Sequence, residues 1–244
     1  MVSFFRKKKS DVDFSALYTD MHSHLIPGID DGVPDLDTAL ELVSGMMNLG
    51  YRKIITTPHV MWDLYKNTND IIQSGWESVK NEIDRRRMAI DFYAAAEYFV
   101  DDHFDTMVEQ DQPLLTLKEN LVLVEFSFVQ EPIELKKIIF RLQIKGYQPV
   151  IAHPERYLYF GANRSWYDEM KNAGCLFQVN LLSLAGYYGK GPFELAEYLA
   201  KKKYIDLLGS DLHQVRHLDA LQNYPAMNFV KKLVDSGLIQ NHLL

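Results

Sequence analysis

Seven short apolar segments rich in β-forming residues recur about 30 residues apart, and this spacing constrains the fold more than any other feature of the chain. The interval is the length of one strand followed by one helix, the βα unit. Residues 121–124 read Leu-Val-Leu-Val without polar alternation, which is typical of a strand covered on both faces. The predicted strands cover residues 18–22, 53–57, 89–96, 121–126, 148–152, 176–180 and 204–209.

The segments between these strands have the apolar spacing of helices. Asp35 stands where an N-cap would, Gly50 stands just past the end, and one helical face between them carries Leu36, Leu40, Val43 and Met47. A second such face, closed by Gly146, is formed by Leu135, Ile138, Ile139 and Leu142. Helices are also predicted over residues 77–87, 193–203 and 229–244.

Because no linker interrupts the seven βα units, we predict an α/β fold with one closed or nearly closed parallel barrel. This single domain is expected to cover residues 18–244. A basic tail, with four consecutive cationic residues at positions 6–9, precedes it over residues 1–17.

The composition excludes several classes of protein. With 244 residues, 47% of them apolar, the chain can form a large core, which excludes disordered and fibrous proteins. A formal net charge of −7 argues against binding nucleic acid by phosphate neutralisation. One cysteine excludes an internal disulfide framework, no apolar run is long enough to span a membrane, and no apolar stretch of a secretory signal follows the basic N-terminus. We therefore predict a cytoplasmic protein without a transmembrane segment.

Residue types that bind metals follow the predicted strands. In a parallel barrel the C-terminal ends of the strands meet at one edge, where active sites lie. Asp20, His22 and His24 alternate at the first of these ends, so the two imidazoles project to the same side. A lone histidine is more often an ordinary surface or core residue, but here five of the eight histidines fall at strand ends beside four carboxylates. The pattern predicts a metal site formed by His22, His24, Asp31, His59, Glu97, Glu125, His153, Asp211 and His213.

Nine donors exceed the about four to six that one ion takes, so two or three ions are implied. Imidazole and carboxylate ligands without thiolate suit Mn, Fe or Zn. Clustered divalent ions activate water and bind oxyanions, which favours hydrolysis of phosphate esters. Arg156 and Arg216, each three residues after a histidine, are placed to bind phosphate oxygens.

The motifs that carry these donors resemble those of the polymerase and histidinol phosphatase (PHP) superfamily, and within it the manganese-dependent protein-tyrosine phosphatases of bacterial capsular and exopolysaccharide loci. The motifs are DMHSHLIPGIDDG at residues 20–32, TPH at 57–59, AE at 96–97, AHPER at 152–156 and SDLH at 210–213. The resemblance implies a distorted, TIM-like (β/α)7 barrel of PHP type. It also implies a cluster of three metal ions, Mn²⁺ first, with Fe, Zn and Mg as alternatives.

The resemblance implies a role for each donor. The first metal would be held by His22, His24, Glu97 and Asp211. Glu97 would bridge to a second metal, held also by Glu125 and His153. The third would be held by Asp31, His59 and His213. Arg156 would bind the phosphoryl group, and Arg216 is the candidate for the family's second arginine, although it follows His213 more closely than is usual there.

The implied function is a metal-dependent protein-tyrosine phosphatase that hydrolyses phosphotyrosine with a metal-activated hydroxide. Its partner would be a phosphotyrosyl protein, a bacterial tyrosine autokinase of capsule synthesis, which would hold it at the periphery of the inner membrane. Thiol-dependent phosphatases require an arginine six positions after the cysteine, and Leu181 stands six positions after Cys175. The aromatic residues expected at the rim of the cleft are Trp62, Tyr65, Tyr157, Tyr159, Tyr187 and Tyr188.

Three other functions remain open at this point. A small-molecule phosphomonoesterase of histidinol-phosphatase type would use the same metal site. A polymerase-associated exonuclease is disfavoured by the acidic charge. A metal-stabilised regulatory module is disfavoured by the complete set of donors.

Overall fold

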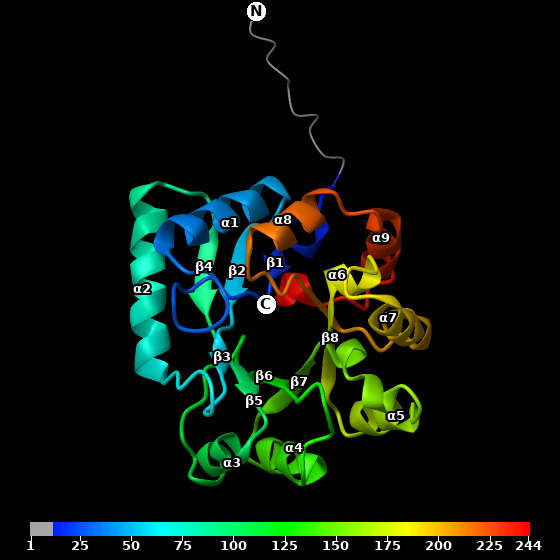
Figure 1. Ribbon diagram of the computed structural model, residues 1–244. Coiled ribbons are helices and arrows are strands. Elements are labelled where there is room, and N and C mark those ends of the chain that lie inside the picture. Colours follow the sequence, from blue (N-terminus) through cyan, green and yellow to red (C-terminus); the bar gives the residue numbers. More distant parts are fainter. Residues whose placement is uncertain (1–11) are drawn as a thin grey trace, which may run out of the picture.

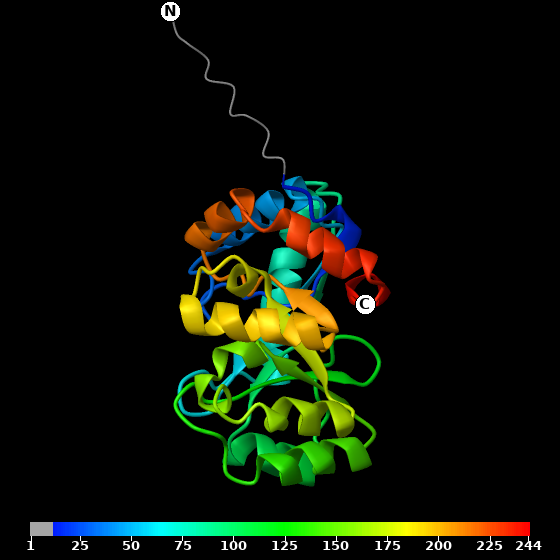
Figure 2. The ribbon, with the colours of Figure 1, turned by 90° about the vertical axis from the view of Figure 1, so that its right-hand side faces the viewer.

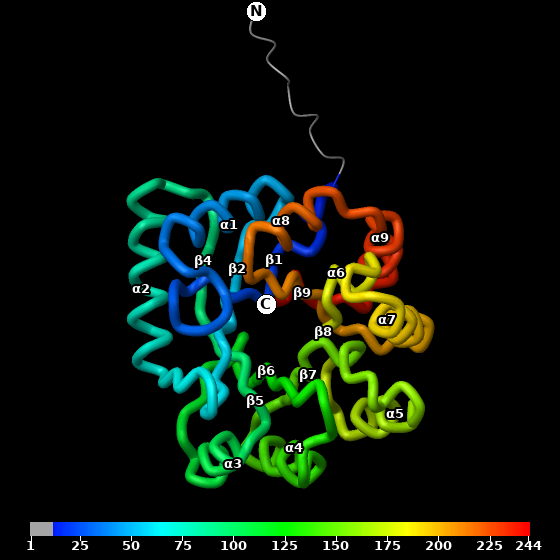
Figure 3. The backbone as a smooth tube through the Cα atoms, viewed as in Figure 1, coloured from blue at the N-terminus to red at the C-terminus, as the bar shows by residue number. Residues whose placement is uncertain are grey.

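The computed structural model describes residues 12–244 and places the strands inside a surrounding set of helices (Figure 1). Every pair of neighbouring strands in this part of the chain is parallel, which confirms the predicted parallel α/β fold. Figure 3 follows the same path with the strands labelled at its centre. The strands are β1 (Thr19–Asp20), β2 (Lys53–Thr56), β3 (His59–Val60), β4 (Asp91–Ala94), β5 (Glu97–Phe99), β6 (Leu121–Glu125), β7 (Gln148–Ala152), β8 (Leu176–Asn180) and β9 (Leu207–Gly209).

The strands form two sheets, in the orders β1-β2-β4 and β3-β5-β6-β7-β8-β9. The predicted strand over residues 89–96 is present but shorter, as β4, and β5, which begins at Glu97, was not predicted. The predicted strand over residues 53–57 matches β2, whereas β3 was not predicted and begins after Pro58, which has no N–H to donate. Hydrogen bonds from Ala95 N to Thr56 O (2.9 Å) and from Glu97 N to Pro58 O (3.1 Å) continue the pairing across the breaks between β2 and β3 and between β4 and β5.

The first and last strand positions lie side by side. Asp211 N donates to His22 O at 2.8 Å, and His24 N donates to Leu212 O at 2.9 Å. Ser23 and Leu212 form a parallel bridge at the same level. β2 and β3 together occupy one strand position, and so do β4 and β5. Counted in this way, the strand order runs from β1 to β9 and then returns to β1, as in a distorted TIM-like barrel.

The helices cover the outside of the strands, as the turned view in Figure 2 shows. They are α1 (Leu36–Asn48), α2 (Asn69–Arg85), α3 (Asp102–Glu109), α4 (Leu135–Ile144), α5 (Ser165–Asn172), α6 (Leu181–Leu184), α7 (Lys190–Lys202), α8 (Val215–Gln222) and α9 (Met227–Asp235). Short 3-10 turns are η1 (Ser15–Leu17), η2 (Pro154–Arg156), η3 (Leu158–Phe160) and η4 (Asn241–Leu243). Between residues 12 and 244 no helix combines the length and the apolarity needed to cross a bilayer.

The predicted helix ends are partly correct. Asp35 caps α1 by accepting from Thr38 N at 2.8 Å, as expected. Helix α2 starts eight residues earlier than predicted because Thr68 caps it, and α7 starts at Lys190. The prediction of a helix over 229–244 is wrong, since α9 ends at Asp235 and Gly237 adopts a left-handed φ of +73°.

The predicted N-terminal tail is described only in part. The cationic positions of the predicted tail lie outside the described residues. Phe14 and Leu17, which the prediction also placed in the tail, are buried and pack into the main core.

The core consists of two clusters that lie on opposite faces of the strands. Val122 and Val124 belong to the larger cluster, whereas Leu123 between them belongs to the smaller one. Because strand side chains alternate with a period of two, the smaller cluster occupies the inner face and the helices cover the outer face. The inner cluster is formed by Met21, Ile55, Ala95, Leu117, Leu123, Val150, Ala152 and Leu207.

Asn241 fastens the C-terminal segment to the first and last strands. Its Nδ2 donates to Thr19 O (2.9 Å) and Leu208 O (2.7 Å), and its Oδ1 accepts from Leu208 N (2.8 Å). Asn241→Ala leaves these buried backbone groups without partners, so we expect the free energy of unfolding to fall by about 2–4 kcal/mol. Urea unfolding measures this, with the exposed Asn223→Ala as a control; equal stability of the two variants would contradict the expectation.

Candidate metal centre

All nine predicted metal donors gather at one edge of the strands. Their ligand atoms fall into four groups, and within each group the atoms lie within 4.8 Å of one another. Shared members join the groups into one cluster. The groups are His24, Asp31, His59 and His213; His22, His24 and Asp211; His22, Glu97 and His153; and His59, Glu97 and Glu125.

Strand register explains why two of the carboxylates point inward. Ala95 and Leu123 belong to the inner cluster, and Glu97 and Glu125 follow each of them by two residues. The period of two therefore keeps both carboxylates on the inner face, at the edge where the apolar side chains end. Both are buried, with 0% and 2% of their surface exposed.

The carboxylate of Glu97 lies at the middle of the cluster. Its Oε2 is 3.1 Å from His22 Nε2, 3.4 Å from His24 Nε2 and 3.2 Å from His59 Nδ1. Nevertheless, no described residue donates a well-aligned hydrogen bond to this oxygen, nor to Oε1 of Glu125. A buried carboxylate oxygen without a donor is costly unless a cation compensates it, so these atoms fit a metal ion.

Hydrogen bonds behind the imidazoles orient their lone pairs. His22 Nδ1 lies 2.8 Å from Gln178 Oε1, and His24 Nδ1 lies 2.8 Å from Asp30 Oδ2. Both partners accept, so each neutral ring carries its proton on Nδ1 and a lone pair on Nε2. The two Nε2 atoms face each other at 3.4 Å. Facing lone pairs repel each other, and a cation between them removes the repulsion. Around metal sites, histidine ligands are commonly held in this way by a hydrogen bond from the other ring nitrogen.

The electrostatics of the cluster favour positive charge. Burial lowers the pKa of His24, but the carboxylates of Asp30 and Glu97 together outweigh it and the pKa rises to about 10. For His22 the carboxylates of Glu97 and Asp211 likewise outweigh burial and raise the pKa. Burial raises the pKa of Asp211, yet the neighbouring cationic side chains hold it well below its usual range.

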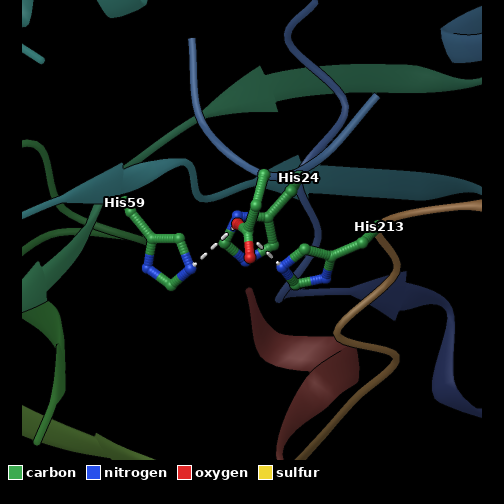
Figure 4. A group of neighbouring side chains, drawn as sticks. His24, His59 and His213 are labelled. Atoms are coloured by element: carbon green, nitrogen blue, oxygen red, sulfur yellow. Dashed lines mark ion pairs between the residues drawn. The ribbon is translucent and has the colours of Figure 1, made fainter. Parts of the chain in front are cut away.

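The donor group that contains Asp31 faces solvent. Figure 4 shows His24, His59 and His213 converging, with ion pairs drawn from His59 and His213 to the carboxylate between them. Asp31 Oδ1 lies 3.4 Å from both His59 Nε2 and His213 Nε2, and the Asp31 side chain is 54% exposed. Hydrogen bonds with His213 and His59 lower the pKa of Asp31 below its ordinary value. This part of the cluster is open to the cleft.

Two of the donors sit in strained backbone. His153 has φ 33° and ψ 54°, and Asp211 has φ 52°, both in the left-handed region that non-glycine residues seldom adopt. His153 directly follows β7, and Asp211 follows β9 after one residue, Ser210. Strain of this kind concentrates at functional sites.

Both predicted arginines line the cleft above the cluster, a cavity of about 230 Å³. Arg156 lies in η2, and its Nη1 donates to Asp211 Oδ2 at 3.0 Å. Arg216 is the second residue of α8 and is exposed. Guanidinium groups at this position can bind an anion placed over the cluster.

Four further polar residues support the cluster, and only one of them, Asp20, was noted in the sequence analysis as a residue that alternates with the histidines. Asp30 and Gln178 orient the imidazoles, and Asn180 Nδ2 donates to Asp211 Oδ2 at 2.7 Å. Asp20, which alternates with the histidines, is not in any donor group. It accepts from Ser210 N (2.9 Å) and Oγ (2.8 Å), and burial raises its pKa to about 7.

His217 lies in α8, away from the strand ends, and was not among the predicted donors. It lines the cleft, and its Nδ1 accepts from His213 N at 3.4 Å. Burial lowers its pKa to about 4. The available signal was its spacing of four residues from His213, which one helical turn brings onto the same side.

Only some of the aromatic residues predicted at the rim lie at or beside the cleft. Tyr188 lines the cleft, Tyr65 stacks on His59 with centroids 5.7 Å apart, and Tyr187 meets His217 edge-on. Tyr157 is wholly buried, so its assignment to the rim is wrong. Trp62 lines a separate pocket and not the cleft. Tyr159 donates its hydroxyl to Ser127 O. Phe128, absent from the prediction, lines the cleft.

Asp30→Asn tests whether the hydrogen bonds behind the imidazoles matter for metal binding. Losing the carboxylate that fixes the His24 tautomer should raise the metal concentration at half-maximal binding about 10- to 100-fold. Titration of the metal-free protein with Mn²⁺ measures this, and Asp63→Asn, at an exposed position, is the matched control. Identical titration curves for both variants would remove Asp30 from the centre.

The fold and the cluster define a parallel α/β barrel protein with a candidate multinuclear metal centre. The family model described as capsular polysaccharide synthesis, CpsB/CapC, matches residues 18–241. The chain therefore belongs to the CpsB/CapC family.

Individual relatives agree with this assignment. The chain is 30% identical to the tyrosine-protein phosphatase YwqE of Bacillus subtilis (strain 168) over 201 residues, which cover 81% of this chain and 78% of YwqE. A crystal structure from work on YwqE of Bacillus subtilis and CpsB of Streptococcus pneumoniae, described as unique metal-dependent tyrosine phosphatases, matches with a TM-score of 0.75 and 25% identity, covering 91% of this chain and 94% of that one. Histidinol phosphate phosphatase of Lactococcus lactis shares the fold at 12% identity, with a TM-score of 0.55 over 91% of this chain and 93% of that one.

Proposed function

We propose that this chain is a metal-dependent tyrosine-protein phosphatase. The observation that carries the proposal is the buried Glu97 oxygen surrounded by three imidazole nitrogens, with no hydrogen bond donated to it from the described residues. Arg156 and Arg216 beside this cluster supply charge for a phosphate. The names of the relatives support phosphotyrosine as the substrate.

We assign the donors to three metal ions. The first would be held by His22, His24 and Asp211, which form one of the four groups, and by Glu97, whose Oε2 lies within 3.4 Å of both imidazoles. The second would share Glu97 and use Glu125 and His153. The third would be held by Asp31, His59 and His213. When bound, such ions supply an activated water and neutralise charge on the phosphoryl oxygens.

The protein's own residues then perform three tasks. Arg156, already near Asp211, binds a phosphoryl oxygen and orients the group over the cluster. Arg216, exposed at the mouth of the cleft, assists in binding the anion. A phenolate leaving group, with a pKa near 10, requires little help from an acid.

Three further assignments belong to this proposal. Mn²⁺ is the metal we favour, because imidazole and carboxylate donors suit it, and Fe, Zn and Mg are the alternatives. The natural substrate is a tyrosine autokinase of capsule synthesis, which would place the protein in the cytoplasm beside the inner membrane. Residues 18–244 form its single catalytic domain.

Turnover measurements test the function directly. The protein is freed of metal with a chelator, reloaded with Mn²⁺, and assayed on a phosphotyrosyl peptide and on histidinol phosphate. We expect activity only with metal and a larger kcat/KM for the peptide. A larger kcat/KM for histidinol phosphate would replace the proposal with a small-molecule phosphatase, and full activity without metal would refute it.

Cys175 provides an internal check on the type of chemistry. The thiol is buried, and burial raises its pKa to about 12, so it is not a thiolate near neutral pH. Cys175→Ala should therefore retain activity within about twofold of the unaltered protein.

A further inference from the structure

The guanidinium of Arg156 lies over two aromatic rings that also line the cleft. Its Cζ is 4.5 Å from the centroid of the Phe128 ring and 4.6 Å from that of Tyr188. We call Phe128 and Tyr188 the aromatic collar. The two residues come from distant parts of the chain, the loop after β6 and the segment between α6 and α7, and both line the same cavity as the metal donors.

Cation–π contact holds the arginine without using its N–H donors. A guanidinium stacks well on aromatic faces and is weakly hydrated, so such contacts are favourable in a partly buried cleft. Nη1 of Arg156 donates to Asp211. The collar therefore orients the planar group while its edge stays available for phosphate oxygens.

Phe128 reaches from the metal donors to solvent. Its ring centroid lies 5.6 Å from that of His153 and 5.8 Å from that of Tyr157. Nevertheless, 48% of the residue is exposed. It offers an apolar face at the mouth of a cleft whose floor consists of charged and imidazole side chains.

A phosphate bound at Arg156 places the rest of its ester next to the collar. In phosphotyrosine a phenyl ring separates the phosphate from the backbone, so that ring would lie at the depth of Phe128 and Tyr188. In phosphoserine a single methylene occupies that depth. Ring pairs with suitable geometry attract one another beyond simple burial.

We propose that the aromatic collar recognises the phenyl ring of the substrate and gives the site its preference for aryl over alkyl phosphate esters. The proposal deepens the phosphatase function and rests on it. Phe128 and Tyr188 are specificity-determining residues, and neither takes part in the chemical step.

Non-hydrolysable phosphonates separate ring recognition from turnover. Phenylphosphonate and methylphosphonate carry the same anionic head, so the ratio of their Kd values isolates the contribution of the ring. Calorimetric titration of the Mn²⁺-loaded protein should show tighter binding of phenylphosphonate. In Phe128→Ala this preference should shrink about three- to tenfold. Methylphosphonate affinity should change by less than about twofold, because Tyr188 and Asp211 still hold Arg156 in place.

Two variants control the experiment. Val129→Ala removes the neighbouring exposed apolar side chain, which is 85% exposed and does not line the cleft, and should leave the ratio unchanged. Phe128→Tyr retains a ring and should retain the preference. Because Phe128 is half exposed, its truncation is not expected to unfold the protein, and thermal denaturation verifies this.

The outcomes are distinct. An equal loss of affinity for both phosphonates in Phe128→Ala would mean that the ring only positions Arg156, and an unchanged ratio would mean that it recognises nothing; each result overturns the proposal. Failure of the unaltered protein to hydrolyse a phosphotyrosyl peptide would instead contradict the phosphatase function. The ratio of phosphonate affinities would still be measurable in that case.

Discussion

Glu97→Gln is expected to lower kcat on p-nitrophenyl phosphate by about a thousandfold or more, because several kcal/mol of transition-state stabilisation depend on bound metal. The substitution preserves shape and removes one negative charge from the only carboxylate that belongs to two of the four donor groups. Bound Mn²⁺, measured by elemental analysis after desalting, should fall together with activity.

The matched control is Glu41→Gln, the same chemical change at an exposed position of α1. It should leave both turnover and metal content unaltered. If Glu97→Gln retained its metal but lost activity, the carboxylate would act on the substrate and not on the ions, and our assignment of the donors would be wrong.

Arg156→Ala is expected to lower kcat/KM by about a hundredfold to a thousandfold, the typical effect of removing one preorganised donor from a developing oxyanion. Metal content should not change, because Arg156 contacts Asp211 through Oδ2 whereas Oδ1 is the oxygen nearest His22. Arg156→Lys should recover only part of the loss, since an ammonium cannot present two parallel donors.

Arg85→Ala serves as the control for this pair, because Arg85 is 70% exposed and bonds only to Glu82 among its charged neighbours in the described chain. Equal activity of the Arg156 and Arg85 variants would show that the phosphate is bound elsewhere in the cleft. Arg216 would then be the next candidate.

The positions of the metal donors could be predicted from the sequence because of a general property of parallel barrels. All strands deliver their C-terminal residues to one edge, so residues far apart in sequence, such as His22, Glu125 and Asp211, were expected to meet there. Strand spacing and residue type were sufficient, and no side-chain geometry was needed.

Other features depend on tertiary contacts that spacing does not contain. The short strands β3 and β5 were not predicted, and they depend on how neighbouring strands pair on either side of Pro58. Gln178 and Asp30 are ordinary polar residues in the sequence, and their importance appears only when an imidazole lies within 2.8 Å. The failure of the predicted C-terminal helix has a local cause, the left-handed Gly237.

Only one member of the aromatic collar was predicted, since Tyr188 was expected at the rim of the cleft and Phe128 was not. Phe128 lies in a loop with other exposed apolar residues, including Val129 and Ile133, and nothing in its local sequence distinguishes it. Its role depends on a cation supplied by η2, whose orientation follows the strained turn at His153.

The side-by-side placement of the first and last strand positions has a consequence for folding. In the proposed assignment one ion is held by His22 and Asp211, about 190 residues apart; such an ion would close a loop that contains most of the chain, and the entropy of closing a loop grows with its length. It would act as a reversible cross-link between the two ends of the barrel. Metal binding and completion of the barrel would then be coupled, so that removing the ions would loosen the seam where the ring of strands begins and ends.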